Sequence, residues 1–243
     1  MNEIAMAESP YGRFLTCPWE TVSQGILSGA FWDEFLKPYF DKYSDPDGVA
    51  VDVGANLGFH SVYLSKYNRK VYAFEMQKWV YWMLCGNLAL NFCYNVEPIC
   101  AAAFAHDGRV SIATEEQVQF HFPQRPDGQV DHRITQYFSS VAVQDAPGDI
   151  SARTVDSVVG DDGPVRIIKT DAQGSDLRAL MGCRAIIERW RPVILFEYEN
   201  CSATVFGDTL ENYYEYLRPF GYHFTTLSGG GAIADVACEQ EAQ

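Results

Sequence analysis

The sequence predicts an α/β fold with a mostly parallel sheet and helices on both of its faces. Short apolar segments alternate with segments of helical spacing, first over residues 49–101 and again over residues 165–227. The apolar segments lack a polar face, which is typical of strands that are covered on both sides. Strands that alternate with helices pair in parallel, because each crossover returns the chain to the same end of the sheet.

Residues 1–47 are predicted to form a helical extension. Apolar and aromatic residues recur at irregular helical spacing over residues 18–43, which predicts one or two helices. Aromatic side chains such as Trp19 and Phe31 favour core packing, with a lid or a homodimer face as the alternatives. The turn sequence Ser-Asp-Pro-Asp-Gly at residues 44–48 ends the extension.

Strands and helices then follow in the order that a parallel sheet requires. In the first half we expect strands at 49–53, 71–74 and 96–101, with helices at 59–67 and 78–92. In the second half we expect strands at 165–169, 192–196 and 222–227, with helices at 175–189 and 208–219. Residues 48–227 would therefore form the main domain. Residues 228–243, which contain a run of glycines, would form a loose tail.

An insertion at residues 104–153 interrupts this order and is predicted to be rich in β-structure. Residues 110–113 and 140–143 alternate between apolar and polar residues as strands do. Prolines mark residues 120–132 between them as a loop. Aromatic residues of the insertion suit the wall of a ligand pocket.

Composition and charge exclude several classes of protein. The chain has 243 residues, of which 47% are hydrophobic and 21% charged, and this suits one large globular domain. Acidic residues outnumber basic residues by 32 to 18, for a net charge of −14. Nucleic acids and anionic membrane surfaces are therefore poor partners, because binding either of them requires a basic face.

The cysteines and the first residues indicate a soluble, cytoplasmic protein. The cysteine count of 7 is odd and no two cysteines have the C-x-x-C spacing, so we expect reduced thiols. The first residues lack the basic and apolar regions of a signal peptide. No segment reaches the ~18 apolar residues of a membrane span.

Carboxylates lie where the predicted strands end. The residues at or beside these ends are Asp52, Glu75, Ala101, Ala102, Asp171 and Glu197. Parallel strands end at the same edge of a sheet, and ligands bind outside that edge. The sequence therefore predicts a binding site formed by these residues.

The loop after the first strand, Gly54-Ala55-Asn56-Leu57-Gly58, is similar to a nucleotide-binding loop. A dinucleotide loop has glycine where this chain has Asn56, so close approach of a pyrophosphate is disfavoured. Glu75 follows Asp52 by 23 residues, at the position where an acidic residue accepts hydrogen bonds from ribose hydroxyls. A ligand with a ribose, no phosphate and a cationic tail fits both features, and S-adenosylmethionine is such a ligand.

Longer segments resemble the FkbM family of class I methyltransferases. Residues 51–61, Val-Asp-Val-Gly-Ala-Asn-Leu-Gly-Phe-His-Ser, and the later Ala73-Phe-Glu75 are similar to the cofactor-binding motifs of that fold. Residues 168–182, which begin Ile-Lys-Thr-Asp-Ala-Gln-Gly, resemble a characteristic FkbM segment, as do Thr154–Ser157 before them and Pro192–Glu197 after them. The resemblance covers residues 48–227 in the right order.

This resemblance implies a Rossmann-like fold with seven strands, the last one antiparallel, and a methyltransferase that uses S-adenosylmethionine. The implied cofactor contacts are Asp52, Gly54, Ala55, Asn56, Gly58, Glu75, Met76, Ala101, Ala102 and Asp171. Three positions depart from the family: Gln173 and Asp176 replace glutamates, and Met76 replaces a proline. Gln173 lacks a negative charge, which argues against a base or a metal ligand at that position and leaves cofactor binding unaffected.

Three residues are candidates for the catalytic chemistry. Asp171 is the preferred base for a hydroxyl acceptor, with capping of the next helix as its alternative role. Lys169 either orients the acceptor or is a paired lysine. His60 is either a base or a residue that packs beside the cofactor. Asp171, Glu197 and Asn200 also offer oxygen ligands for Mg²⁺, although a metal is the less favoured hypothesis.

The sequence thus predicts a methyltransferase that most simply methylates a hydroxyl group on a small molecule, a sugar or another glycan, or a natural product. The insertion at 104–153 would shape the pocket for this acceptor. An amine or a peptide carboxylate is the alternative acceptor. A non-catalytic protein that binds S-adenosylmethionine and an NAD-type oxidoreductase are the alternative functions.

Overall fold

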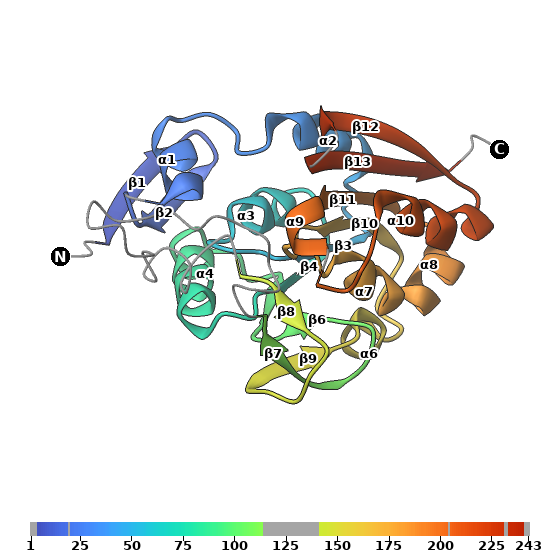
Figure 1. The fold of residues 1–243 in the computed structure, drawn as a ribbon. Coiled ribbons are helices and arrows are strands. Elements are labelled where there is room, and N and C mark those ends of the chain that lie inside the picture. The colour runs from blue at the N-terminus through green and yellow to red at the C-terminus, as the bar shows by residue number, and fades with distance from the viewer. Residues whose placement is uncertain (1–3, 19, 114–140, 204, 231–232, 241–243) are drawn as a thin grey trace.

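A seven-stranded sheet forms the centre of the fold (Figure 1). The computed structural model describes residues 4–18, 20–113, 141–203, 205–230 and 233–240. Across the sheet the strands lie in the order β12-β13-β11-β10-β3-β4-β5. Their bounds are β3 (Val49–Val53), β4 (Lys70–Phe74), β5 (Val96–Ile99), β10 (Val165–Thr170), β11 (Val193–Glu199), β12 (Tyr222–Gly230) and β13 (Ile233–Gln240).

The directions of these strands confirm the predicted Rossmann-like arrangement. The neighbours β11, β10, β3, β4 and β5 all pair in parallel. β13 pairs antiparallel with both β11 and β12, so β12 runs in the same direction as the parallel strands. The antiparallel strand is therefore β13 and not the segment at 222–227, which the sequence predicts to be the last strand.

The prediction of a loose tail over residues 228–243 is wrong. Residues 228–230 complete β12 and residues 233–240 form β13, whose Ala234, Val236 and Cys238 side chains are buried in the core. The glycines that suggest a loop belong to a β-hairpin. Gly229 takes a left-handed φ of 73°, and a Cβ there would lie 2.3 Å from the carbonyl oxygen of Ile233. Glycine is therefore required at this position because the two strands approach closely.

Helices cover both faces of the sheet. One face packs against α1 (Thr21–Leu27), α2 (Lys37–Tyr43), α3 (Phe59–Ser65) and α4 (Lys78–Leu90). The other face packs against α6 (Val155–Val159), α7 (Asp176–Met181), α8 (Arg184–Trp190) and α10 (Leu210–Leu217). Ile167 belongs to the first hydrophobic core and Ile168 to the second, as expected when successive strand residues point to opposite faces.

The helix predicted over 175–189 is divided into α7 and α8. Gly182 lies between them, and a Cβ at Gly182 would lie 2.1 Å from the carbonyl oxygen of Phe104. The chain therefore passes too close to the segment after β5 for a continuous helix with side chains at this point.

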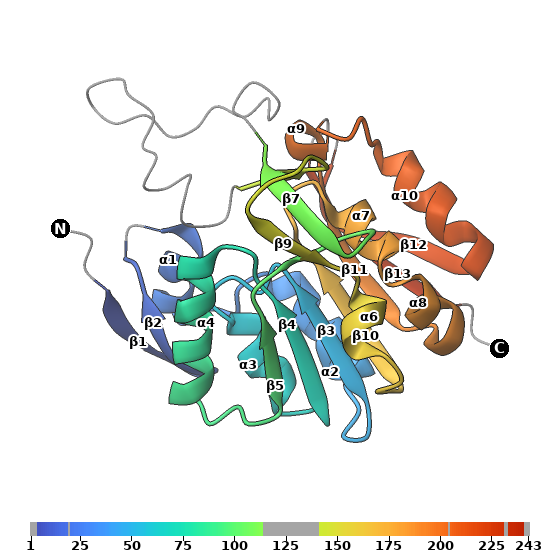
Figure 2. The ribbon, with the colours of Figure 1, turned by 90° about the horizontal axis from the view of Figure 1, so that it is seen from below.

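The extension over residues 1–47 is only partly helical, which corrects the prediction. It begins with an antiparallel hairpin of β1 (Ala5–Ser9) and β2 (Gly12–Thr16), and then forms α1, the 3₁₀-helix η1 (Glu34–Leu36) and α2. Figure 2 shows the hairpin beside α4. Asn87 of α4 accepts a hydrogen bond of 2.6 Å from the backbone N–H of Leu15. This tertiary contact provides a hydrogen-bond partner for the edge of β2, and it cannot be predicted from local residue spacing.

The predicted β-structure of the insertion is confirmed for its described residues. Four short strands form a second sheet in the order β6-β9-β7-β8, at one end of the large sheet (Figure 2). They are β6 (Ala102–Ala103), β7 (Gly108–Ile112), β8 (Val143–Gln144) and β9 (Ile150–Arg153). The loop predicted at 120–132 lies outside the described residues. Across the part of the chain that is described, none of the helices has the length and apolar character needed to cross a membrane.

Candidate functional site

The glycine loop after β3 lies against the end of β10. Gly54 has a φ of 68°, and a Cβ on it would lie 1.8 Å from the carbonyl oxygen of Asp171. Asn56 also has a positive φ, of 51°, and Gly58 begins α3 with a φ of 86°. The loop therefore needs residues that tolerate left-handed backbone conformations, and this requirement explains the Gly-x-Asn-x-Gly pattern.

Asp52 and Lys169 form a buried ion pair beneath this loop. Asp52 is fully buried and accepts a hydrogen bond of 2.6 Å from Oγ of Ser61. The Nζ atom of Lys169 lies 3.3 Å from Oδ1 of Asp52 and donates to the carbonyl oxygens of Val53 and Gly54. Burial lowers the pKa of Lys169, but Asp52 and Asp171 more than offset this effect and raise it above its usual value.

The structure thus assigns Asp52 to the support of the loop. Asp52 and Gly58 line neither of the two cavities at this sheet edge, and their contact with a cofactor stays a prediction. Lys169 has its Nζ directed at the loop carbonyls and at two carboxylates. Its geometry favours the paired lysine over the alternative role of orienting an acceptor.

A small cavity of about 60 Å³ lies between the ends of β3, β4 and β5. Seven of the residues predicted for cofactor binding line this cavity: Gly54, Asn56, Glu75, Met76, Ala101, Ala102 and Asp171. Glu75 accepts hydrogen bonds from the backbone N–H groups of Gln77 (2.8 Å) and Asn56 (3.1 Å). Burial nevertheless raises the pKa of Glu75 to about 7. We refer to this space as the small cavity.

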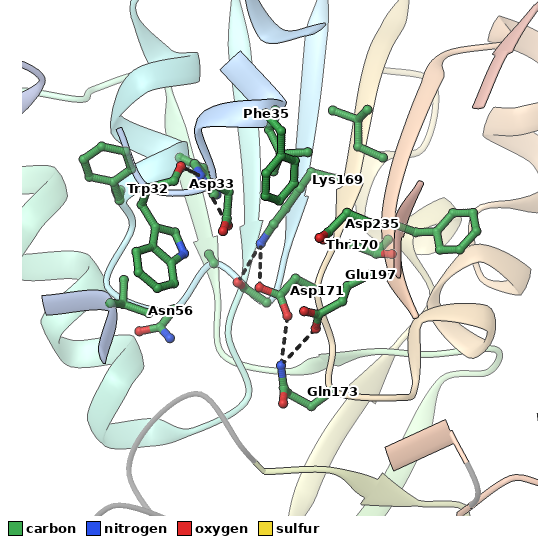
Figure 3. Close-up of a pocket in the computed structure, with 18 of the residues that line it drawn as sticks. Trp32, Asp33, Phe35, Asn56, Lys169, Thr170, Asp171, Gln173, Glu197 and Asp235 are labelled. Carbon is green, nitrogen blue, oxygen red and sulfur yellow. Dashed lines mark hydrogen bonds and ion pairs between the residues drawn. The ribbon is translucent and has the colours of Figure 1, made fainter. Parts of the chain in front are cut away.

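A second cavity of about 270 Å³ adjoins the small cavity. Gly54, Asn56, Asp171 and Gln173 line both of them. Figure 3 shows that the wall of this large cavity combines segments far apart in the sequence. The lining residues labelled in Figure 3 are Trp32, Asp33, Phe35, Asn56, Lys169, Thr170, Asp171, Gln173, Glu197 and Asp235. Ala55 and His60, predicted from sequence, also line the large cavity.

The insertion contributes little to these two cavities within the described residues. Val141 lines the small cavity, and none of the described residues at 104–113 or 141–153 lines the large one. That the insertion shapes the acceptor pocket stays a prediction.

Gln173 connects two carboxyl groups at the border of the two cavities. Its Nε2 lies 3.0 Å from Oδ1 of Asp171 and 3.3 Å from Oε2 of Glu197 (Figure 3). The backbone of Gln173 has a φ of 50°. Asp176 stabilises this turn, because its carboxylate accepts from the backbone N–H groups of Ala172 and Gly174.

The two carboxyl groups beside Gln173 have different surroundings. Burial, together with the nearby charge of Asp171, raises the pKa of Glu197 to about 11. Glu197 is therefore protonated at neutral pH. Asp171 lies 3.7 Å from the ammonium of Lys169.

Three acidic residues of the large cavity were not predicted as site residues: Asp33, Glu199 and Asp235. Asp33 precedes η1 with a left-handed φ of 52°, and burial raises its pKa to about 7. Asp235 belongs to β13, and burial also raises its pKa. For Asp33 and Asp235, the only signal that the sequence offers is an acidic residue among apolar ones. This signal does not indicate that the two segments reach the same cavity.

His60 is buried among aromatic rings. Its Nε2 lies 3.0 Å from the carbonyl oxygen of Trp32, and the rings of Phe31, Phe40 and Phe59 surround it. Burial lowers the pKa of His60 to about 4, so the ring is neutral and its Nε2–H donates to Trp32. This arrangement favours packing over proton transfer.

The candidate metal ligands are not brought together. Asn200 lines neither cavity, and its Oδ1 accepts a hydrogen bond of 3.0 Å from the hydroxyl of Tyr198. Between Asp171 and Glu197 lies the amide nitrogen of Gln173, which is not a metal ligand. No group of three His, Cys, Asp or Glu side chains within the described ranges has the arrangement of a metal site.

Comparisons with known proteins agree with the fold. The sequence matches the methyltransferase FkbM domain over residues 52–224, and a comparison with curated proteins gave no match. An FkbM methyltransferase from Methylobacillus flagellatus is 16% identical, with a TM-score of 0.49 over 83% of this chain and 50% of that chain. An rRNA methylase from Streptococcus thermophilus is 13% identical, with a TM-score of 0.51 over 84% of this chain and 92% of that one. A precorrin-6y C5,15-methyltransferase from Geobacter metallireducens is 12% identical, with a TM-score of 0.53 over 96% of this chain and 100% of that one.

The strand order and the latter two structures define the fold as that of a class I methyltransferase. The FkbM domain covers most of the sequence, and the chain belongs to the FkbM methyltransferase family. It spans 50% of the length of the Methylobacillus FkbM methyltransferase that it matches.

Proposed function

We propose that this protein is a methyltransferase that binds S-adenosylmethionine across the small and the large cavity. The observation that carries the proposal is Glu75, a buried carboxylate that lines the small cavity at the end of β4. A carboxylate at this position of a Rossmann-like sheet accepts hydrogen bonds from ribose hydroxyls. Such donors also offset the cost of burying the charge, which is the cost that raises the pKa of Glu75.

Other residues of the two cavities fit the same cofactor. Oδ1 of Asn56 is a buried acceptor that lacks a hydrogen-bond partner among the described residues, and it suits a donor group on a ligand. Met76, Ala101 and Ala102 give the small cavity an apolar wall suited to an adenine ring. Asp171, which lines both cavities, suits the sulfonium and ammonium groups at the other end of the cofactor.

Asp171 is the proposed base. When bound, S-adenosylmethionine supplies an electrophilic methyl group, whose transfer to a hydroxyl oxygen leaves S-adenosylhomocysteine and a proton to be removed from the acceptor. Asp171 lines both cavities and accepts this proton in our proposal. Lys169 acts only indirectly, because its contacts with the carbonyls of Val53 and Gly54 fix the loop that holds the cofactor.

The acceptor is proposed to be a hydroxyl group on a small molecule, a sugar or another glycan, or a natural product. The acidic wall of the large cavity disfavours a peptide carboxylate or a nucleic acid, because like charges repel. A non-catalytic protein that binds the cofactor is the second candidate. Gln173, which replaces a glutamate of the family, motivates this alternative. Such a protein would bind the cofactor and methylate no acceptor.

Calorimetric titration with S-adenosylmethionine, S-adenosylhomocysteine and NAD⁺ tests the proposed cofactor. We expect micromolar affinity for the first two ligands, and a loss of about 10- to 100-fold in Glu75→Ala, since hydrogen bonds to a charged group are removed. Glu97→Ala, which removes an exposed carboxylate on the neighbouring strand β5, is the matched control and should leave the affinity unchanged. Binding of NAD⁺ without S-adenosylhomocysteine would contradict the proposal.

A further inference from the structure

The wall of the large cavity contains more carboxyl groups than the proposed cofactor needs. They come from the segment before η1, from the end of β10, from β11 and from β13. The residues are Asp33, Asp171, Glu197, Glu199 and Asp235. Even when Glu197 is protonated, four carboxyl groups remain around one cavity. S-adenosylmethionine carries a sulfonium, an ammonium and a carboxylate, and so brings a single net positive charge.

The described cations that line the large cavity do not balance these carboxyl groups. Lys169 is the one lysine or arginine among the described residues that line the large cavity. Its ammonium is already engaged with Asp52 at 3.3 Å and with two backbone carbonyl oxygens. His60 is neutral because its burial lowers its pKa. Asp33 and Asp235 therefore face the cavity without an ion pair to a lysine or arginine of the described residues, and burial raises the pKa of both carboxyl groups.

Aromatic side chains line the same cavity. Trp32, Phe35 and Phe59 line the large cavity, and Figure 3 shows Trp32 and Phe35 on the side of Asp33. Organic ammonium groups are recognised by aromatic faces together with carboxylates, because both offer negative potential while the rings also contact the carbon skeleton. Trp32 and Phe35 lie in the N-terminal extension, which thus contributes to the specificity of the cavity.

We propose that the acceptor is a small organic molecule that carries a protonated amine, held by Asp33 and Asp235, besides the hydroxyl that receives the methyl group. This inference rests on the proposed function and adds the chemical class of the substrate. At about 270 Å³, and with part of that space taken by the cofactor, the cavity suits a single ring or a short chain. An amino sugar and a phenol with an aminoalkyl chain are molecules of this class.

Matched pairs of probes test the proposal on the full chain saturated with S-adenosylhomocysteine. Glucosamine is compared with N-acetylglucosamine, and tyramine with 4-ethylphenol, by calorimetry. We expect the amine of at least one pair to bind about tenfold tighter or more than its neutral partner, and to bind more weakly at high salt, as charge-assisted contacts do. Asp235→Asn and Asp33→Asn should each reduce this preference severalfold while S-adenosylhomocysteine still binds. Glu239→Gln, which removes a carboxylate of β13 outside the cavity, is the control.

The possible outcomes separate the two proposals. Equal or tighter binding of the neutral partners, or no amine binding at millimolar concentration, would overturn the amine proposal while S-adenosylhomocysteine still binds. An amine preference that survives both Asp235→Asn and Asp33→Asn would overturn it as well. Failure of the wild-type protein to bind S-adenosylhomocysteine would instead contradict the proposed function.

Discussion

Lys169 donates a hydrogen bond of 3.1 Å to the carbonyl oxygen of Gly54, and this contact ties the end of β10 to the loop after β3. The register of the sheet makes the contact possible, because Lys169 pairs with Asp52 across β10 and β3. One buried ammonium therefore sets the position of the proposed cofactor loop, the charge balance of Asp52 and one side of the large cavity.

Lys169→Met should destabilise the protein and weaken cofactor binding together. The substitution leaves Asp52, fully buried, without its cation, and breaking such a pair costs about 3–5 kcal/mol. Urea unfolding and titration with S-adenosylhomocysteine measure the two effects. The double variant Lys169→Met with Asp52→Asn should recover part of the stability. Lys78→Met, at an exposed position of α4, should change stability by less than about 0.5 kcal/mol. Full affinity and stability in Lys169→Met would contradict the supporting role.

Asp171→Asn and His60→Gln should have different effects on catalysis. Removal of a general base costs about 10²–10⁴ in kcat, so Asp171→Asn should lose activity in this range while S-adenosylhomocysteine binds within a few-fold. His60→Gln keeps a donor for the carbonyl oxygen of Trp32 and should retain most of kcat, with some loss of stability. Single-turnover rates, measured with an acceptor that the wild-type protein methylates, report both effects. The reverse pattern would make His60 the base.

Ligand-free protein should lose stability as the pH rises from 6.5 to 8.5. Burial raises the folded-state pKa of Glu197 to about 11, and that of Glu75, Asp33 and Asp176 to about 7. The folded state thus binds more protons than the unfolded state in this range, and stability falls as the pH increases. Below pH 6.5 the effect weakens, because His60 has a lowered pKa and opposes protonation of the folded state.

Thermal unfolding at several pH values measures this dependence. Each proton that is bound only in the folded state lowers the free energy of unfolding by about 1.4 kcal/mol per pH unit. Glu197→Gln should reduce the slope of this free energy against pH by less than that amount, because Glu197 is not fully buried. Glu188→Gln, on the exposed side of α8, should leave the slope unchanged. A stability that rises between pH 6.5 and 8.5 would show that these carboxyl groups are ionised in the folded protein.

Gln173→Glu should create a site for a divalent cation and impair catalysis without one. The substitution would replace the amide nitrogen between Asp171 and Glu197 by a third carboxyl oxygen. Three carboxyl groups repel one another unless a cation or protons neutralise them, and Mg²⁺ prefers such oxygen ligands. Titration with MgCl₂ should detect binding in Gln173→Glu that the wild-type protein lacks. Unchanged activity of Gln173→Glu without added metal would show that the amide of Gln173 between Asp171 and Glu197 is not needed for catalysis.

The sequence predicts the parallel strands and the small cavity well, because both depend on local patterns. Glu75 and Met76 follow the mostly apolar strand β4, Ala101 lies just after β5, and the order of those strands along the chain sets which ends are neighbours. By contrast, the pairing of Asp52 with Lys169 depends on the register between β3 and β10. Periodicity identifies a strand but not its register, so the sequence does not reveal that Lys169 is the partner of Asp52.

The whole of the large cavity could not be predicted because part of its wall comes from segments near the two ends of the chain. Asp33 lies in an irregular segment between α1 and η1, and Asp235 in a strand whose glycine-rich entry is typical of a loop. Their proximity to Asp171 depends on how the extension and the final hairpin pack on the sheet. The hairpin of β1 and β2 could not be predicted for a related reason. The backbone N–H groups at its edge donate to Asn87 of α4 and to Asn91 just after α4, and not to another strand.

A crystal structure of the protein with S-adenosylhomocysteine would test the central claim most directly. The account predicts that both ribose hydroxyls donate to Glu75 in the small cavity and that the homocysteine end extends past Asn56 into the large cavity. A ligand bound elsewhere, or bound with Glu75 free of contacts to the ribose, would contradict the proposed site.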